Sequence, residues 1–410
     1  MNIESKLSTT SKNIKSSIIR ELLKISDPAM ISFGGGVPDP ETFPREELAV
    51  IASEVVSKEY KFTLQYGTTE GDDVLKKQYI RLLEEHENIK DLNNDNLLIT
   101  VGSQQALYLA GLTFLDEESY CGVTRPVYLA AASAFAQRNP KFISVNLSEK
   151  GIDTDYLESE LIKLRERNEL HKFKFMYVVT NFHNPAGITM PLDNRKKLIE
   201  LAEKYDFIIL EDDPYGALRF EGTKVPSIFS MNSERVIMLN TFSKILSPGM
   251  RIGVIIGNTQ AIRRMAMAKQ AVDLCCSPVT QRLTARFLER YDLFEQIKPT
   301  IELYKHKKDV FMKAMQDNLG DIKGVSWTKA EGGLFTWLTL PQQIDTMEMF
   351  EMAKKEKVLY IPGEAFFVDN PLKNTMRLSF CLPTEEQLVE GMKRLRRTID
   401  KYCAAKGIKL

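Results

Sequence analysis

The sequence predicts an α/β protein built on a mostly parallel β-sheet with helices on both faces. Short runs rich in Val and Ile carry this prediction, because each is too brief for a helix and is separated from the next by a segment of helix length. The seven runs are 97–101, 120–124, 142–145, 175–180, 207–210, 236–240 and 252–256. Sheets of this kind bind their ligands beyond the carboxyl ends of the strands.

Polar clusters follow five of these runs where each strand is expected to end. Gly102 and Ser103 follow the first run and open a helix, whose free N–H groups can hold a phosphate. The other clusters are Pro126 with Tyr128, 181–187, 211–215 and 241–244. We therefore expect a ligand site at one edge of the sheet.

The last run, 252–256, is expected to lie antiparallel to its neighbours. Arg251 precedes this run, whereas the other cluster residues follow their strands. A parallel strand would place Arg251 at the wrong edge of the sheet.

Lys244 is the most informative residue of the sequence. Thr241, Ser243 and Arg251 surround it with two hydroxyls and a guanidinium, which are phosphate ligands, and a lysine amine can condense with an aldehyde. An aldehyde that carries a phosphate is pyridoxal 5′-phosphate. Taken alone, this run could also be an ordinary surface turn, so the interpretation depends on the rest of the chain.

Taken in order, these motifs resemble those of the fold-type I pyridoxal-phosphate enzymes. Among these enzymes, the chain is most similar to class I/II aminotransferases of the kynurenine and 2-aminoadipate aminotransferase group, over essentially all 410 residues. The resemblance implies transfer of an amino group between an L-amino acid and a 2-oxo acid by a ping-pong mechanism. The implied amino acids are aromatic, 2-aminoadipate or glutamate, or branched aliphatic. It also implies a homodimer with shared active sites.

The resemblance implies catalytic roles for three residues. Lys244 would be the Schiff-base lysine and the proton carrier, Asp212 would pair with the pyridine nitrogen, and Tyr128 would stack on the ring. Asp212 could instead be an ordinary helix N-cap before Pro214, and Tyr128 could be simple packing.

Further residues match the cofactor and substrate positions of the family. Asn184 and Tyr215 resemble the donors to the ring 3′-oxygen, and Tyr66 resembles a tyrosine that reaches the phosphate of the neighbouring subunit. The implied phosphate ligands are Ser103, Gln104, Thr241, Ser243 and Arg251. The implied substrate-binding residues are Arg377 for the α-carboxylate, Asn184, Gly36 against the substrate and Arg20 at its far end.

Three residues depart from the family pattern. Thr241 stands where serine is usual, His183 where glutamine is usual, and Ala186 where threonine is usual. Threonine keeps the hydroxyl, so the phosphate site should persist. The other two changes leave the exact reaction and the preferred substrate open.

Two units are expected along the chain. Residues 48–298 should form the large cofactor domain, and residues 1–47 with 299–410 should form an N-terminal arm and a smaller α+β domain. The smaller domain should contain helices over 302–315 and 385–402, and strands around Trp337, Leu359 and Leu378.

Composition sets the remaining expectations. Fifty-five basic residues balance fifty-five acidic ones, so no nucleic acid or anionic membrane is expected as a partner. The five cysteines and four histidines form no metal-binding motif, and the start of the chain lacks a signal-peptide pattern, so we expect no metal and a cytoplasmic protein.

Two other functions remain open from the sequence alone. The same cofactor also permits β-elimination, and aminotransferase-like domains also serve as non-catalytic effector modules. Conversion of bound cofactor by an added amino acid would indicate transfer, whereas release of ammonia and pyruvate would indicate elimination.

Overall fold

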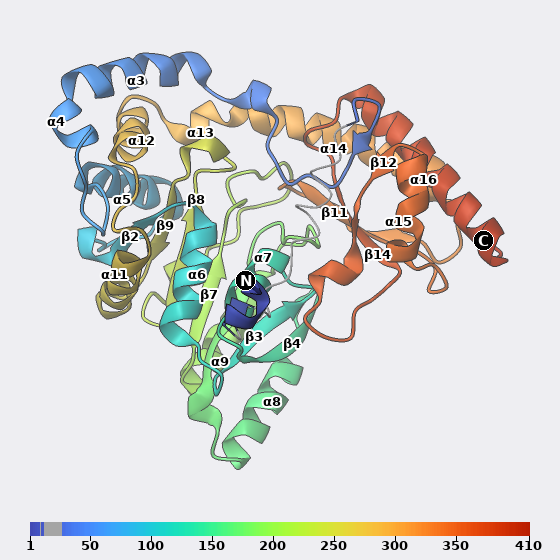
Figure 1. Ribbon diagram of the computed structural model, residues 1–410, viewed down its shortest axis with the longest axis horizontal. Helices are drawn as coiled ribbons and strands as arrows, with labels where there is room; N and C mark the ends of the chain where they lie inside the picture. Colours follow the sequence, from blue (N-terminus) through green and yellow to red (C-terminus); the bar gives the residue numbers. More distant parts are fainter. Residues whose placement is uncertain (9, 12–26) are drawn as a thin grey trace.

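The computed structural model describes residues 1–8, 10–11 and 27–410, and its centre is an eight-stranded sheet (Figure 1). The strands lie in the order β2-β9-β8-β7-β6-β3-β4-β5. Their bounds are β2 Leu97–Thr100, β3 Tyr120–Arg125, β4 Lys141–Ser148, β5 Gly151–Ile152, β6 Phe173–Val179, β7 Ile208–Asp212, β8 Val236–Thr241 and β9 Gly253–Ile256. All seven predicted strands are present. The sequence did not predict β5, a two-residue strand that pairs antiparallel with β4, because so short a strand has no periodicity.

Strand β9 confirms the predicted reversal of direction. It is antiparallel to both β2 and β8, whereas β8, β7, β6, β3 and β4 are parallel. Gly253 at its start pairs with Thr100 on one side and with Thr241 on the other. Arg251 therefore lies at the sheet edge where β2 and β8 end.

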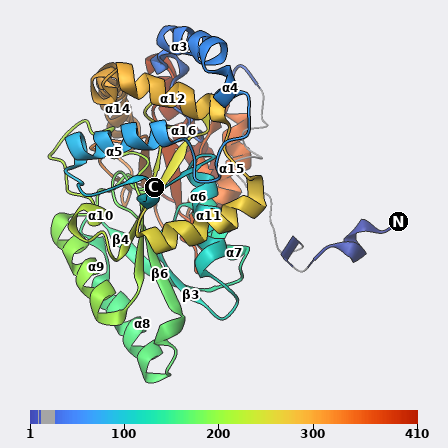
Figure 2. The ribbon, with the colours of Figure 1, turned by 90° about the vertical axis from the view of Figure 1, so that its left-hand side faces the viewer.

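Both faces of the sheet are buried under helices, so the strands are apolar throughout. Along β6, Phe175 and Tyr177 enter the core on one face, while Met176 and Val178 enter the core on the other. The first face is covered by α6 Ser103–Phe114, α7 Leu129–Ala136 and α11 Thr259–Asp273. The second is covered by α5 Asp73–Glu87, α8 Thr154–Glu166, α9 Leu192–Tyr205 and α12 Pro278–Arg290. Figure 2 shows α9 and α7 on opposite sides of β6 and β3.

A second, antiparallel sheet lies in the C-terminal part of the chain, in the order β10-β11-β14-β13. Its strands are β10 Ser326–Trp327, β11 Phe335–Thr339, β13 Ile361–Pro362 and β14 Thr375–Ser379. The N-terminal strand β1 Ile31–Ser32 pairs in parallel with β12 Val358–Leu359, so the segment that carries Gly36 joins this part of the molecule.

Both predicted C-terminal helices are present and are longer than expected. They are α14 Lys298–Leu319, which has a proline in its first turn, and α16 Glu385–Lys406, and the two pack against each other (Figure 1). The remaining helices are α3 Arg45–Lys58, α4 Tyr60–Thr63, α10 Ile228–Met231, α13 Leu293–Gln296 and α15 Thr346–Lys355. Short 3-10 helices lie at Ile3–Lys6, Pro40–Thr42, Asn94–Asn96, Leu170–Lys172, Pro248–Met250 and Gly363–Phe366. None of the helices in the described part of the chain has both the length and the apolar character of a membrane span.

Candidate active site

Lys244 lies in the turn that follows β8, at the carboxyl edge of the main sheet. Its side chain is half-buried, and Nζ donates a hydrogen bond to the carbonyl oxygen of Gly36 at 2.7 Å. Burial, together with the positive charge of Arg377, lowers the pKa of Lys244 to about 8. An amine with this pKa is partly unprotonated near neutral pH and can act as a nucleophile or a base.

Groups suited to a phosphate meet where β2, β8 and β9 adjoin. The hydroxyl of Thr241 donates to Oγ of Ser243 at 2.9 Å. The guanidinium of Arg251 donates to the carbonyl oxygen of Val101 at 3.1 Å, beside the first turn of α6. A helix of twelve residues leaves its first N–H groups without helical partners, so this corner combines a cation, two hydroxyls and free amides.

Two glycines make this corner possible. Gly102 has φ of +73°, and a Cβ there would lie 2.6 Å from a guanidinium nitrogen of Arg251. A Cβ on Gly253 would lie 2.7 Å from the backbone nitrogen of Ser103. Side chains at these positions would displace both Arg251 and the helix N-terminus.

Asp212, the last residue of β7, is buried and has two unequal carboxylate oxygens. Its Oδ2 accepts a hydrogen bond from the hydroxyl of Tyr177 at 2.7 Å, whereas its Oδ1 is buried and has no partner among the described residues. Burial raises the pKa of Asp212 to about 7, an effect that the Tyr177 bond opposes and the charge of Asp213 increases. A buried acceptor without a partner is costly, so this site suits a ligand with a cationic N–H group, such as a protonated pyridine.

Asn184, Tyr215 and Arg377 form one chain of contacts across the same edge. Nδ2 of Asn184 donates to the hydroxyl of Tyr215 at 3.4 Å, and Oδ1 of Asn184 accepts from Arg377 at 2.9 Å. These residues come from the loops after β6 and β7 and from β14. The contacts thus connect the main sheet to the C-terminal sheet.

The guanidinium of Arg377 packs against two aromatic rings. Its central carbon lies 4.3 Å from the ring centroid of Phe335 and 5.2 Å from that of Phe366. One terminal nitrogen donates to the carbonyl oxygen of Gly34 at 2.7 Å, and Nε has no partner within the part of the chain that the structure describes. Gly36 is close by, since a Cβ there would lie 3.0 Å from the ring of Phe335.

His183 fixes the loop that carries Asn184. Its Nδ1 accepts from the backbone N–H of Ala186 at 3.3 Å, so Nε2 carries the hydrogen and donates to the hydroxyl of Thr124 at 3.0 Å. Burial lowers the pKa of His183 to about 3, so the ring is neutral. This unusual residue therefore ties the loop to the end of β3.

The other predicted site residues differ in how buried they are and in what they contact. Tyr128 is the N-cap residue directly before α7 and is partly buried against the core that contains Tyr177. Gln104 is exposed, its side chain donates to the carbonyl oxygen of Ala130 at 3.3 Å, and its backbone N–H lies in the first turn of α6. Tyr66 is 79% exposed. Arg20 lies outside the described residues.

The sequence did not single out Tyr177, Phe335 or Phe366. Each is an aromatic residue in or beside an apolar strand or turn, a pattern that ordinarily indicates core packing. Their importance depends on contacts with Asp212 and Arg377, which are distant in sequence.

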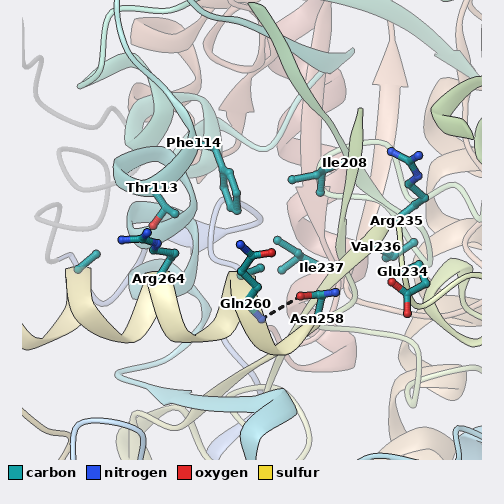
Figure 3. Close-up of a pocket in the computed structure, with 12 residues that line it drawn as sticks. Thr113, Phe114, Ile208, Glu234, Arg235, Val236, Ile237, Asn258, Gln260 and Arg264 are labelled. Carbon is teal, nitrogen blue, oxygen red and sulfur yellow. Dashed lines mark hydrogen bonds between the residues drawn. The ribbon is translucent and has the colours of Figure 1, made fainter. Parts of the chain in front are cut away.

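A separate pocket of about 590 Å³ lies at the opposite edge of the main sheet (Figure 3). Its lining includes Phe114 at the end of α6, Ile208 and Val236 at the starts of β7 and β8, and Gln260 and Arg264 on α11. None of the predicted site residues within the described ranges lines it. Space alone therefore does not locate the site, whereas the convergence of functional groups does.

Comparisons with known proteins agree with this geometry. Residues 30–395 match the family described as aminotransferase class I and II. The chain is 43% identical to aromatic-amino-acid aminotransferase 1 of Thermococcus litoralis over 97% of this chain and 95% of that protein. It is 35% identical to 2-aminoadipate transaminase of Thermus thermophilus over 94% of each chain. The crystal structure of the multiple substrate aminotransferase from Thermococcus profundus superposes with a TM-score of 0.93 at 43% identity, covering 99% of this chain and 100% of that one.

Proposed function

This chain belongs to the class I and II aminotransferases, and from that premise we propose which residues hold its cofactor, which substrates it takes and how it assembles. It is a pyridoxal-phosphate-dependent aminotransferase, which acts on amino acids and 2-oxo acids. When bound, the cofactor supplies an aldehyde that reacts with amines and a ring that accepts electrons from the substrate. The protein must hold that group flat, keep its ring nitrogen protonated and place a base beside the substrate.

We propose that the cofactor lies at the carboxyl edge of the main sheet. The observation that carries this proposal is the buried Oδ1 of Asp212, which has no partner in the described ranges and lies at the same sheet edge as Lys244. Asp212 would hold a proton on the ring nitrogen, Tyr128 would stack on the ring, and Asn184 with Tyr215 would bind its 3′-oxygen. The proposed phosphate ligands are Ser103, Gln104, Thr241, Ser243 and Arg251, of which Ser103 and Gln104 lie in the first turn of α6.

Lys244 would act as the base that removes the proton from the substrate α-carbon. Its lowered pKa lets Nζ take that proton and return it to the product. Arg377 would bind the α-carboxylate, and the backbone at Gly36, whose carbonyl oxygen accepts from Nζ of Lys244, would lie against the substrate.

Removal of Arg377 should weaken the binding of every substrate, because each one has an α-carboxylate. We expect Arg377→Lys to lose roughly 1.5–3 kcal/mol per charged hydrogen bond, seen as a lower kcat/KM for aromatic and acidic amino donors alike. Steady-state kinetics with several donors would test this. The unfolding temperature of the variant should be measured as well, because Arg377 also donates hydrogen bonds to Asn184 and Gly34 and its loss could destabilise the fold. A loss confined to one class of donor would contradict the assignment.

The proposed substrates are aromatic amino acids, 2-aminoadipate or glutamate, and branched aliphatic amino acids. The aromatic rings of Phe335 and Phe366 beside Arg377 support an apolar pocket wall, and the names of the relatives include aromatic and 2-aminoadipate substrates. A half-reaction screen would test this range, with loss of the cofactor absorbance band on addition of each amino acid as the signal. Ammonia and pyruvate release instead of conversion would indicate elimination.

Arg20 is proposed to bind the far carboxylate of acidic substrates. Arg20→Ala should then lower kcat/KM for glutamate and 2-aminoadipate by roughly 10-fold or more, with aromatic and leucine-like donors nearly unchanged. The same half-reaction screen provides the measurement. Equal losses for both groups would show that Arg20 is structural.

We also propose a homodimer with shared active sites. Tyr66 would reach the phosphate of the partner's site, and it is 79% exposed near Leu64, which is 65% exposed. Such exposure of neighbouring apolar side chains is typical of an interface. Sedimentation equilibrium would test it, and a monomer at micromolar concentration would contradict it.

The domain boundaries are also a proposal. Residues 48–298 are proposed as the cofactor domain, and residues 1–47 with 299–410 as the N-terminal arm and the smaller domain.

A further inference from the structure

Tyr177 and Asp212 lie on neighbouring parallel strands and point to the same face of the main sheet. Val179 of β6 pairs with Asp212 of β7, and Tyr177 is two residues before Val179. Residues two apart on a strand share a face, so Tyr177 and Asp212 are diagonal neighbours. Their side chains meet in a hydrogen bond of 2.7 Å, which the hydroxyl donates to Oδ2.

The ring of Tyr177 has no room to move. Tyr177 and Phe135 of α7 are both fully buried, and their rings meet edge to face with centroids 5.5 Å apart. The hydroxyl therefore keeps one position, which fixes the plane of the Asp212 carboxylate. A solvent-exposed donor would not fix the carboxylate plane, because water molecules would compete with it for the carboxylate oxygen.

The two oxygens of Asp212 are thereby given different tasks. Oδ2 is held by Tyr177, whereas Oδ1 is buried without a partner among residues 27–410. We propose that Tyr177 is a positioning residue of the active site, which holds Oδ2 so that Oδ1 pairs with the ring nitrogen of pyridoxal phosphate. The inference rests on the proposed role of Asp212 in holding the cofactor.

The Tyr177 hydroxyl also favours the ionised form of Asp212, which is the form that pairs with a cationic ring. The titratable groups that act on Asp212 are Asp213 beside it on the chain, Tyr177 on β6, Tyr128 at the start of α7 and Tyr215 in the loop after β7. Burial and the charge of Asp213 raise the pKa of Asp212, whereas the hydrogen bond from Tyr177 lowers it. Without that donor, the neutral carboxyl would persist to higher pH and would not pair with a cationic ring.

Tyr177→Phe in the full-length chain tests this role, because it removes one hydroxyl and keeps the ring. Pyridoxal phosphate is titrated into the cofactor-free protein at several pH values, with bound-cofactor absorbance as the signal. We expect binding about 10- to 100-fold weaker at neutral pH, as for one charged hydrogen bond. We also expect the pH at which affinity falls by half to move upward by about one unit.

The chain offers a matched control in Tyr205→Phe. The Tyr205 hydroxyl also donates to a carboxylate, Oε1 of Glu158, at 2.9 Å, but on α9 and α8. This variant should keep the wild-type affinity and pH midpoint. Tyr177→3-fluorotyrosine serves as a second variant, because its more acidic hydroxyl is a stronger donor and should move the midpoint downward.

Three results would overturn the proposal in distinguishable ways. If Tyr177→Phe keeps the wild-type affinity and midpoint while Asp212→Asn weakens binding, Tyr177 has no positioning role and the role of Asp212 stands. If Asp212→Asn also binds cofactor like the wild type, the proposed role of Asp212 fails and the inference fails with it. A Tyr177→Phe variant that only unfolds at a lower temperature, with an unchanged midpoint, would show a purely structural role.

Discussion

Lys244→Ala is expected to abolish amino transfer almost completely while the chain still folds and still binds pyridoxal phosphate without a covalent bond. Loss of a positioned base alone slows a reaction about 100- to 10,000-fold, and here the covalent exchange of the cofactor is lost as well. The side chain lies in a turn and its Nζ bonds only one backbone carbonyl among the described residues, so little packing is lost. Single-turnover conversion of bound cofactor by an amino acid would measure the loss.

Borohydride reduction and peptide mapping of the wild type provide the direct check on Lys244. The label should appear on the peptide that contains Lys244, and a label on another lysine would reject the assignment. Lys313→Ala is a suitable control, because Lys313 is exposed and its ammonium pairs with Asp317 one helical turn away. This control should retain full activity and full labelling.

The lowered pKa of Lys244 gives a further readout of the same residue. The amine reacts only when it is unprotonated, and the unprotonated fraction rises as pH passes through the pKa of about 8. Covalent attachment of cofactor to the cofactor-free chain should therefore become faster between about pH 7 and pH 9 and then level off.

The main sheet could be predicted from the sequence because its strands are buried on both faces. Such strands are continuous apolar runs, and polar residues begin abruptly where they end, as at Asp212 and Thr241. The direction of β9 followed from the place of Arg251 before its strand rather than after it. The short strand β5 has only Gly151 and Ile152, too few residues to give a pattern.

The positions of the site residues could be expected, but the contacts that tune them could not. Tyr177 acts on Asp212 from another strand, and its place in an apolar run indicates packing. The rings of Phe335 and Phe366 contact Arg377 because β11 pairs with β14 and the short helix at Gly363–Phe366 lies beside them. His183 departs from the family pattern in the sequence, but its bonds to Thr124 and Ala186 depend on the conformation of the loop.

Asp212→Asn is expected to spare the fold and to cripple catalysis. The amide oxygen can still accept the hydrogen bond of Tyr177, and the amide nitrogen takes the place of Oδ1 with almost no change in shape. An amide carries no charge, so it would not keep the cofactor ring nitrogen protonated, and the ring would accept electrons poorly. We expect kcat to fall by roughly 100-fold or more, the size of effect seen when a preorganised electrostatic partner is removed. Normal turnover in a normally folded variant would show that Asp213, or no carboxylate, has this role.

The stability of the cofactor-free chain separates this electrostatic role from a structural one. Folding raises the pKa of Asp212 from its ordinary value near 4 to about 7, because burial disfavours the charged form. The ionised carboxylate therefore destabilises the folded state, and this cost grows as pH rises between those two values and is constant above about 7. Asp212→Asn removes the cost, so the variant should gain stability over the wild type at about pH 8 and gain much less at about pH 5. Urea unfolding at the two pH values would measure the difference. A variant less stable than the wild type at the higher pH would show that the carboxylate holds the fold together, and its loss of activity would then say nothing about the ring nitrogen.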